Sequence, residues 1–321
     1  AGRLRNQVSF MLSACNFYMP IFEEALDAYG LPLELRYLPI IESALNPSAV
    51  SRAGASGLWQ FMIGTGKIYG LESNSLVDER RDPIKATWAA ARYLKEMYDI
   101  YGDWNLVIAA YNCGPGTINK AIRRANGETD YWKIYNYLPK ETRGYVPAFI
   151  AANYVMTYYC DHNICPMETN IPASTDTVQV NKNLHFEQIA DLCNVPLDQI
   201  KSLNPQYKKQ MIPGDSKPYT LRLPIDAIST FIDKQDTIYT HRADELFRNR
   251  KTVAVKDITP ATRKTTSAVA GKGNLTYYTI KSGDTLSTIA RKYGVTIKDI
   301  QRWNGMSSTK IAAGKRLKIY K

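Results

Sequence analysis

Apolar residues recur every three to four positions over most of the first 160 residues, which predicts a series of amphipathic helices. Residues 6–29 give the first of these. We expect this helix to restart at Pro20, because proline fits the first turn of a helix, and to end at Gly30. No segment in this half shows a convincing strand pattern. The chain is therefore predicted to begin with a mainly α-helical domain.

Capping residues place the later helices of this domain. Asp82 precedes Pro83 and a periodic run that Gly102 ends, which predicts one long helix. Three more helices are expected: from Asp103 through Ala110, near residues 117–125 and near residues 146–159. The apolar run 145–160 is shorter than the ~20 residues of a membrane-spanning helix, so it predicts a buried core helix.

The second half of the chain contains an internal repeat. Shifting the sequence by 100 positions superposes one apolar pattern on another: Val180, Ile189, Val195, Leu197, Ile200 and Asn204 fall on Ile280, Ile289, Val295, Ile297, Ile300 and Asn304. Each copy has the pattern of a strand, two helices and a strand over some 45 residues. The predicted domains are a helical domain at 1–170, a first small α+β module at 171–230, a linker at 231–274 and a second module at 275–321.

Charge is distributed unevenly between the two halves. Residues 1–170 carry 16 Lys and Arg against 17 Asp and Glu, whereas residues 171–321 carry 25 against 13. The basic half favours attraction to a polyanion, either nucleic acid or an acidic cell-wall polymer. Its aromatic residues do not alternate with basic ones on a strand platform, which disfavours nucleic acid.

Glu42 is the main candidate for chemistry. It lies in a predicted helical segment among apolar residues that include Leu38 and Leu45. Apolar surroundings disfavour the charged form of a carboxyl, so the pKa of Glu42 should rise toward neutrality. The simpler alternative is a surface helix whose glutamate faces water.

Four motifs occur in a fixed order around this residue. They are Glu42-Ser43 with Asn46-Pro47, then Gly57-Leu58-Trp59-Gln60-Phe61-Met62, then Ala110-Tyr111-Asn112-Cys113-Gly114-Pro115-Gly116, and last Glu141-Thr142-Arg143-Gly144-Tyr145-Val146. In this order they resemble the lytic transglycosylases, goose-lysozyme-like members of glycoside hydrolase family 23. Cys113 departs from the family, which more often has alanine there. The resemblance implies a lysozyme-like α-helical fold over the first half of the chain.

The resemblance also assigns roles to residues of these motifs. Glu42 is implied as the catalytic acid and base, and Tyr145 as a hydrogen-bond partner of Glu42 or of the reacting sugar. The substrate-binding residues are expected to be Ser43, Gln60, Met62, Tyr111, Asn112 and Tyr145. Ser43 and Asn46 also fit a simple helix end. Trp59 and Phe61, on the alternate positions, are expected in the core.

The implied reaction is cleavage of the MurNAc–GlcNAc β-1,4 bond of peptidoglycan with formation of a 1,6-anhydro-MurNAc end. Ordinary glycosidases need two carboxylates, and the motifs supply one. Asp78, Glu79 and Asp82 are the best candidates for a second. We interpret them as partners of Arg80 and Arg81 and as a helix cap. The alternatives are a goose-type hydrolase, should one of them face Glu42, and a non-catalytic peptidoglycan-binding scaffold.

The second repeat copy, at 276–321, resembles a LysM domain, a module that binds N-acetylglucosamine-containing glycans. The resemblance places the glycan groove beside Gly283, Asp284 and Thr285. In the first copy Asn183, Leu184 and His185 replace this turn, so that copy is degenerate and is interpreted as a spacer.

No cofactor or metal is expected, because the five cysteines and three histidines show no zinc-site spacing. Cys160 and Cys165 bracket a short loop and either form a disulfide or remain isolated buried thiols. The expected partner is the peptidoglycan glycan strand, bound by a monomer in the bacterial cell envelope, in the periplasm or at the outer membrane. Attachment through a lipid anchor absent from this sequence is left open.

Overall fold

The computed structural model describes residues 4–168, 171–172, 174–247, 275–281, 284–304, 306, 311 and 314–320. The chain divides into two compact units, Ala1–Pro260 and Ala261–Lys321. The first unit holds the helical domain and the first repeat copy, called here the middle module. The second unit holds the C-terminal module. Gly283, one of the predicted glycan-binding residues, lies outside the described residues.

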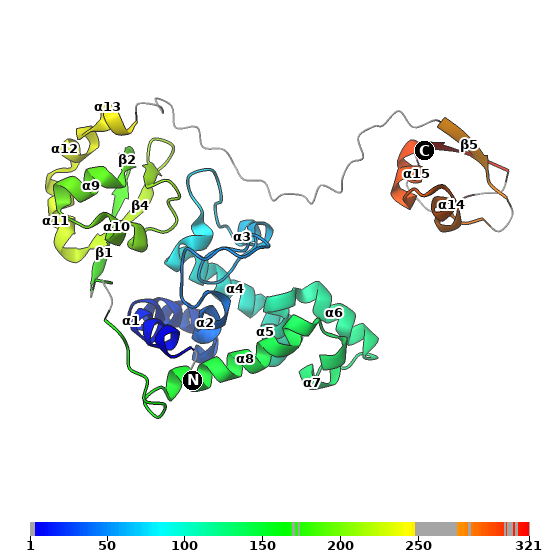
Figure 1. Ribbon diagram of the computed structural model, residues 1–321, viewed down its shortest axis with the longest axis horizontal. Helices are drawn as coiled ribbons and strands as arrows, with labels where there is room; N and C mark the ends of the chain where they lie inside the picture. The colour runs from blue at the N-terminus through cyan, green and yellow to red at the C-terminus, as the bar shows by residue number, and fades with distance from the viewer. Residues whose placement is uncertain are drawn as a thin grey trace. The chain divides into compact units, whose positions relative to one another are not determined.

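The helical domain is built from eight α-helices and three 3₁₀ helices among the described residues (Figure 1). In chain order these are α1 (Arg5–Ala28), η1 (Leu33–Tyr37), α2 (Leu38–Ser43), α3 (Ile63–Ile68), η2 (Glu79–Arg81), α4 (Pro83–Tyr101), α5 (Trp104–Cys113), α6 (Pro115–Arg124), α7 (Tyr131–Ile134), η3 (Tyr135–Tyr137) and α8 (Lys140–Thr157). The predicted mainly helical fold is confirmed.

Local capping signals account for the ends of α4 and α5. The Asp82 carboxylate accepts hydrogen bonds from the backbone N–H groups of Ile84 and Lys85, and Gly102 ends α4 in the left-handed conformation. Asp103 caps α5 through the Leu106 N–H at 2.8 Å. Both helices begin where their capping residues predict, and α4 ends as predicted at Gly102, whereas α5 continues past the predicted Ala110 to Cys113.

Two helix boundaries differ from the prediction. Helix α1 continues through Pro20, because Tyr18, Phe22 and Leu26 form one buried stripe whose packing outweighs the hydrogen bond that proline removes. Helix α8 begins at Lys140, before the predicted start at residue 146, and includes Pro147. Both cases show tertiary burial prevailing over a local helix-breaking signal.

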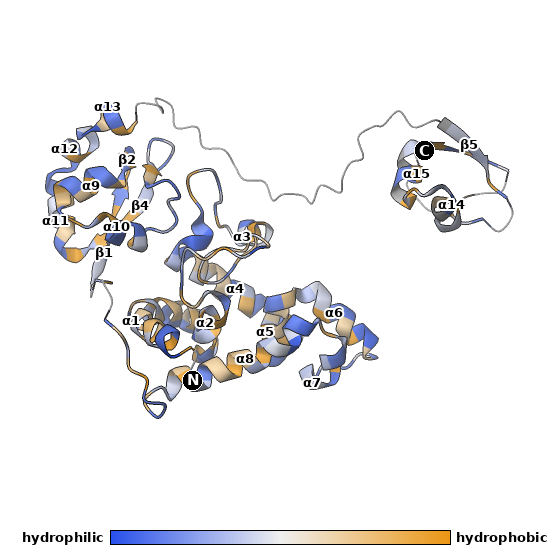
Figure 2. Ribbon diagram, in the orientation of Figure 1, coloured by the Kyte–Doolittle hydropathy of each residue, from blue (hydrophilic) through white to orange (hydrophobic). Residues whose placement is uncertain are grey.

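One apolar core fills the helical domain, and it includes Tyr145 of the predicted site as well as Trp59. Trp59 and Phe61 are 0% and 3% exposed, as predicted for these alternate positions. The Trp59 indole packs against Phe22 and donates a hydrogen bond to Thr87 Oγ1 at 2.9 Å. Apolar and polar residues alternate along the helices in Figure 2, as expected for helices with one buried face.

The middle module follows the predicted order of strand, two helices and strand. It consists of β1 (Thr175–Val180), β2 (Asn183–His185), α9 (Phe186–Cys193), α10 (Leu197–Leu203), β3 (Met211–Pro213) and β4 (Tyr219–Pro224). Strands β1 and β4 pair antiparallel, with Val180 opposite Tyr219. A second antiparallel pair joins β2 to β3, with Leu184 opposite Ile212. The sequence did not predict this second pair.

The predicted linker at 231–274 is wrong over its first part. Three helices follow β4: α11 (Ile225–Asp233), α12 (Gln235–Thr240) and α13 (Ala243–Leu246). They bury Phe231 and Ile238 in the core of the middle module, where these side chains are 1% and 0% exposed. The segment between Phe231 and Ile238 contains mostly polar residues, so it shows little of the apolar periodicity that predicts a helix. The other predicted domain boundaries remain predictions.

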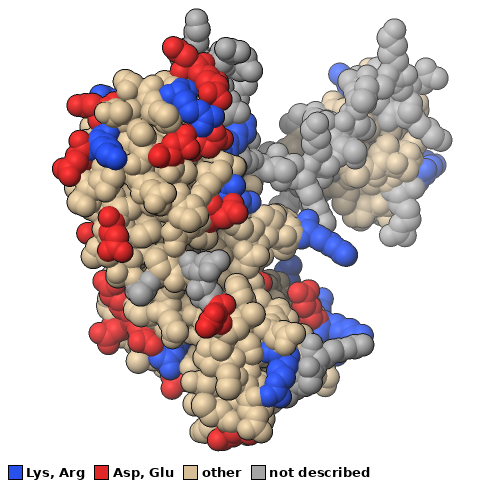
Figure 3. Space-filling model, turned by 60° about the vertical axis from the view of Figure 1, so that its left-hand side comes forward, with Lys and Arg blue, Asp and Glu red and all other residues tan. Residues whose placement is uncertain are grey.

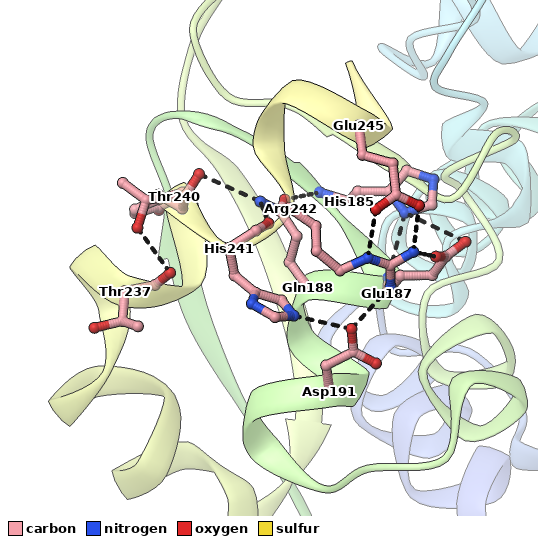
Figure 4. Close-up of polar contacts among 10 residues, drawn as sticks. His185, Glu187, Gln188, Asp191, Thr237, Thr240, His241, Arg242 and Glu245 are labelled. Atoms are coloured by element: carbon pink, nitrogen blue, oxygen red, sulfur yellow. Dashed lines mark hydrogen bonds and ion pairs between the residues drawn. The ribbon is translucent and has the colours of Figure 1, made fainter. Parts of the chain in front are cut away.

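A polar cluster fixes these helices to α9 (Figure 4). Gln188 donates to the carbonyl groups of Tyr239 and His241 at 3.2 and 2.7 Å. The Arg242 guanidinium contacts Asp191 at 2.9 Å, and His241 Nε2 lies 3.0 Å from the same carboxylate. Residues 225–246 therefore belong to the folded middle module.

The C-terminal module repeats the same order of elements. It contains β5 (Leu275–Thr279), α14 (Leu286–Tyr293), α15 (Ile297–Trp303) and β6 (Arg316–Tyr320), with β5 and β6 antiparallel. Ile280, Ile289 and Ile300 form its core at positions equivalent to Val180, Ile189 and Ile200. Asp284, in the predicted glycan-binding turn, accepts hydrogen bonds from Tyr278 Oη at 2.7 Å and Lys281 N–H at 2.9 Å. Thr285 forms a local hydrogen-bonded turn with Thr288.

All five cysteines are free thiols. Cys160 and Cys165 are exposed and unpaired, so neither the predicted disulfide nor the alternative of buried thiols holds for this loop. Among the described residues, no group of three or more His, Cys, Asp and Glu side chains could hold a metal ion. None of the described helices is long and apolar enough to cross a membrane.

Candidate active site

Glu42 lies in the last turn of the short helix α2. The helix stops directly after it, because Ala44 and Leu45 both adopt left-handed backbone conformations, with φ of 52° and 58°. Such conformations cost on the order of 1–3 kcal/mol each for residues other than glycine, and they persist where the surroundings enforce them. Leu45 is 1% exposed, so its burial holds the turn. The helix end that presents Glu42 is therefore a strained, packed turn.

Ser43 joins this turn to the loop that carries the second motif. Its hydroxyl lies 3.1 Å from the Pro39 carbonyl and 2.9 Å from the Leu58 carbonyl, within hydrogen-bond distance of both. Asn46 accepts a hydrogen bond from the Ser48 N–H at 2.9 Å. Both side chains thus fix backbone around Glu42. This is the simple helix-end alternative considered for them, and it leaves the predicted sugar contact of Ser43 as a prediction.

The environment of Glu42 raises the pKa of its carboxyl from 4.5 to about 7. Burial among apolar groups is the main cause, and the negative charge of Glu141 adds to it. The Tyr145 hydroxyl donates a hydrogen bond to Glu42 Oε1, which acts in the opposite direction. Tyr145 is 9% exposed and comes from α8. A carboxyl that titrates near neutral pH can both donate and accept a proton there.

The loop between Gly54 and Met62 forms one wall of the site. Gly57 has a φ of 88°, and a Cβ atom there would lie 1.8 Å from the Arg80 carbonyl oxygen, so only glycine fits. Gln60, at φ 48°, turns its amide back to donate to the Gly57 and Ala49 carbonyl groups at 2.8 and 3.3 Å.

A cavity of about 250 Å³ lies against this loop. Four of the predicted substrate-binding residues line it: Gln60, Met62, Tyr111 and Asn112. Met62 is 45% exposed. The Tyr111 hydroxyl donates to the Trp59 carbonyl at 2.8 Å, so its ring rather than its hydroxyl is available to a ligand. Cys113, the departure from the family pattern, also lines the cavity.

Tyr111 connects the cavity to the carboxyl. Burial raises the pKa of Tyr111 well above its usual value, and the nearby charge of Glu42 contributes. The cavity-lining residues and the Glu42–Tyr145 pair are therefore neighbours through Tyr111, although the cavity lining itself does not include Glu42.

Two residues near the site were missed as individual candidates. Thr142 donates from its hydroxyl to Asn112 Oδ1 at 2.8 Å and is 1% exposed, so it fixes the Asn112 amide. Glu141 is exposed and is the carboxylate whose charge acts on Glu42. Both belong to the fourth motif, so their position in it was a signal that could have found them.

Asp78, Glu79 and Asp82, the candidates for a second catalytic carboxylate, all have other partners. Asp78 binds the Arg80 guanidinium through both oxygens at 2.8 Å, and Asp82 caps α4. Glu79 pairs with Lys85, not with Arg80 or Arg81 as predicted, because α4 brings the Lys85 ammonium over it. Arg81 instead donates to Ser56 Oγ at 3.1 Å. None of the contacts described for these carboxylates reaches Glu42.

We expect replacement of Glu141 with Gln to shift the pH dependence of activity. Removing this negative charge lowers the pKa of Glu42, so the loss of the protonated acid, which is half complete near pH 7, moves to lower pH. The shift should be a few tenths of a pH unit, because exposed charge pairs are worth roughly 0.2–1 kcal/mol and one pKa unit is ~1.36 kcal/mol. The pH profile of kcat/KM measures it. An unshifted alkaline limb would show that Glu141 does not act on Glu42.

Taken together, these residues define a lysozyme-like helical protein whose candidate site contains a carboxyl, Glu42, with a pKa near neutrality. Three family models match the chain: the transglycosylase SLT domain over residues 19–134, the LysM-like domain of lytic transglycosylase MltD over 174–240 and the LysM domain over 278–319. The chain therefore carries an SLT domain, and two LysM-type modules follow it.

The chain is also similar to individual proteins. The chain is 33% identical over 294 residues to membrane-bound lytic murein transglycosylase D of Escherichia coli strain K12, an alignment covering 90% of this chain and 60% of that protein. It is 33% identical over 124 residues to the soluble lytic murein transglycosylase of the same strain, covering 37% and 19%. The solved 70 kDa soluble lytic transglycosylase of E. coli matches 44% of this chain and 24% of that chain, at 29% identity and a TM-score of 0.39. The chain thus spans about 60% of the curated relatives that match most of it.

Proposed function

We propose that this protein is a lytic transglycosylase that cleaves the MurNAc–GlcNAc β-1,4 bond of peptidoglycan and forms 1,6-anhydro-MurNAc ends, in cell-wall remodelling or turnover. The observation that carries the proposal is the Glu42 carboxyl, which has a pKa of about 7 and accepts a hydrogen bond from Tyr145. The SLT-domain match over residues 19–134 supports it.

In the proposed mechanism Glu42 acts twice. Its protonated form first donates to the glycosidic oxygen, and the bond between that oxygen and C1 of MurNAc breaks. The carboxylate then accepts the proton of the C6 hydroxyl of the same MurNAc as that oxygen attacks C1. The proton returns to Glu42, no water is consumed, and the 1,6-anhydro ring closes. A pKa near 7 suits a group that must both give and take a proton.

The other site residues position the sugar. Gln60 and Met62 line the subsite beside the bond, together with the ring of Tyr111 and the amide of Asn112. Thr142 holds the Asn112 carbonyl oxygen, so the NH₂ group of that amide remains to donate to the glycan. Tyr145 restrains the Glu42 carboxyl in the orientation needed for both proton transfers.

The C-terminal module supplies attachment to the substrate. We expect Gly283, Asp284 and Thr285 to bind the glycan, and the LysM match over residues 278–319 supports this assignment. The proposed partner is the glycan strand of peptidoglycan, met by a monomer in the cell envelope. On the face shown in Figure 3 the charged side chains of the described residues are interspersed with uncharged surface, and no broad basic stripe of the kind that binds nucleic acid runs over them. Outer-membrane attachment through a lipid anchor is part of the proposal.

Mass spectrometry of digested peptidoglycan tests the proposed reaction. Products with 1,6-anhydro ends, lighter by one water than reducing ends, are expected. The exposed Glu141 carboxylate near Glu42 is the observation that keeps a goose-type hydrolase as the second candidate. Reducing ends would establish the hydrolase, and the absence of any released product would favour the non-catalytic scaffold.

A further inference from the structure

In the middle module, the segment that replaces the predicted glycan-binding turn, Asn183–His185, is paired with the loop between α10 and β4. Strand β2 lies in the loop between β1 and α9, and β3 lies in the loop between α10 and β4. Asn183 donates from its backbone N–H and its side chain to Asp215 at 3.1 and 2.5 Å. A Cβ atom at Gly214 would lie 2.2 Å from the Lys182 carbonyl oxygen. A sugar could enter between these loops only by breaking the β2–β3 pair.

The loop between α10 and β4 instead contacts the helical domain. Val77 and Tyr207 form an antiparallel bridge. The Asp78 N–H donates to the Gln206 carbonyl at 2.9 Å, and the Lys208 N–H donates to the Leu76 carbonyl at 2.8 Å. Leu76 and Val77 are 4% and 0% exposed and belong to the core of the middle module, although they come from the helical domain.

Charged side chains reinforce this junction. Lys208 Nζ donates to the Asn74 carbonyl at 2.8 Å and lies 3.7 Å from Asp78 Oδ2. Lys217 binds the Glu72 carboxylate at 2.7 Å. Burial opposes ionisation of Asp78, but the hydrogen bonds and charge of Arg80, helped by Lys208, keep its pKa below the usual value. Asp78 is therefore a charged group held by cations from both domains.

Asp78 is the partner that orients Arg80. Both carboxylate oxygens accept from the guanidinium, whose remaining nitrogen donates to the carbonyl groups of Gly54 and Phe61 at 2.8 and 2.9 Å. These two carbonyl groups stand at the ends of the loop that carries Gln60. Arg80 and Asp78 are 5% and 1% exposed, so water does not replace these bonds.

We propose that the middle module is an intramolecular brace that positions the active-site loop 54–61 through Lys208, Asp78 and Arg80, in place of binding glycan. Lys208 of the module holds the Asp78 carboxylate, and this carboxylate orients the Arg80 guanidinium, which binds the Phe61 carbonyl at one end of the loop. The Leu58 carbonyl of the same loop lies 2.9 Å from the Ser43 hydroxyl, next to Glu42. Lys208 is a positioning residue in this arrangement. The catalytic part of this inference rests on the proposed function.

The variant Lys208→Met tests the brace, because methionine keeps the aliphatic stem and removes the ammonium group. We expect kcat on soluble peptidoglycan fragments to fall roughly three- to tenfold, the size typical of coupling within one salt-bridge network, with KM nearly unchanged. Lys208→Arg should restore most of the rate. Lys209→Met, at the exposed neighbouring position, is the matched control and should behave as the parent protein.

Hydrogen exchange gives a readout that does not depend on activity. The amide groups of Ser56 and Gln60 donate within the loop, to Phe61 and Gly57. They should exchange severalfold faster in Lys208→Met than in the parent and in Lys209→Met. Unchanged exchange at these amides, or equal effects of the two Met variants, would overturn the brace. If Lys208→Met shows faster exchange but the parent protein releases no anhydro product, the brace is supported and the proposed function is refuted. The two failures are therefore distinguishable.

A double-mutant cycle locates the coupling. Asp78→Asn directly weakens the hydrogen bonds between this side chain and the Arg80 guanidinium, so it should lower kcat more than Lys208→Met does. Combined with Lys208→Met, it should cost little more than alone, because both changes act through the same carboxylate. Fully additive losses would mean that Lys208 does not act through Asp78 and would refute the proposed route.

Discussion

Replacing Glu42 with Gln is expected to reduce formation of anhydro products by ~10²–10⁴-fold, the usual value of general acid–base catalysis, with loss at the upper end. Glutamine keeps the shape of the side chain and the contact with Tyr145, but it carries no proton to transfer. The same group serves both steps of the proposed mechanism, so neither step retains its catalyst. Glycan binding should be retained, because the cavity-lining residues are unchanged.

Turbidity clearance of cell walls and sedimentation with them measure the two effects separately. The matched control is Glu34→Gln, which removes an exposed carboxylate from η1. Undiminished clearance by the Glu42 variant would refute the mechanism.

The same substitution should not destabilise the fold. Folding raises the pKa of Glu42 from 4.5 to about 7, so the folded state holds this proton more tightly than the unfolded chain does. Stability that depends on this group is therefore lost as pH rises from 4.5 toward 7, where the buried carboxyl ionises. Glutamine does not ionise, so above pH 7 the variant should unfold at the same or a higher temperature than the parent. A lower unfolding temperature would point to misfolding as the cause of any lost activity.

Removing residues 248–321 is expected to abolish most of the binding to insoluble peptidoglycan while leaving the reaction intact. This segment carries 17 Lys and Arg against 3 Asp and Glu, together with the LysM domain. Tethering a catalytic domain to its polymer through a second site commonly raises overall affinity by ~10²–10⁴-fold. The cut at residue 247 keeps α11 to α13, whose Phe231 and Ile238 complete the core of the middle module.

Sedimentation with cell walls at low and high salt divides this binding into its parts. The part that comes from net charge should disappear at high salt, and the part that comes from sugar contacts should persist. The shortened chain should still form anhydro ends from soluble glycan. Equal sedimentation of the shortened and full chains at both salt concentrations would rule out a targeting role for the C-terminal module.

Local signals account for what the sequence predicted well. Asp82 and Asp103 cap helices through residues two or three positions away, so their effect is visible in a short window. The order of strand, two helices and strand in both repeat copies followed from an apolar pattern that each copy carries within some 45 residues. The contact between Glu42 and Tyr145, 103 residues apart, was expected only because the motifs resemble a known family.

Contacts between distant segments could not be predicted from such local patterns. Lys208 and Asn74 are 134 positions apart, and no pattern in either segment indicates the other. The bonds from Arg80 to the Gly54 and Phe61 carbonyl groups involve backbone acceptors, which every residue offers, so the sequence does not mark them. Within the 78–82 segment, Asp78 pairs with Arg80 and Asp82 caps α4 as predicted, whereas Glu79 pairs with Lys85 and not with the predicted arginines. The link of these carboxylates to the middle module was not visible.

The burial of Leu76 and Val77 within the middle module limits how this protein can be divided. A fragment ending near residue 170 would contain every residue proposed for catalysis, yet it would expose two large apolar side chains and leave the Val77 backbone without its bridge to Tyr207. Exposed apolar surface beside an unpaired backbone edge favours association with other chains. Expression of the helical domain alone should therefore yield aggregated protein. For the same reason, a chimaera that exchanges modules between relatives should take residues 72–79 and 204–219 from the same parent.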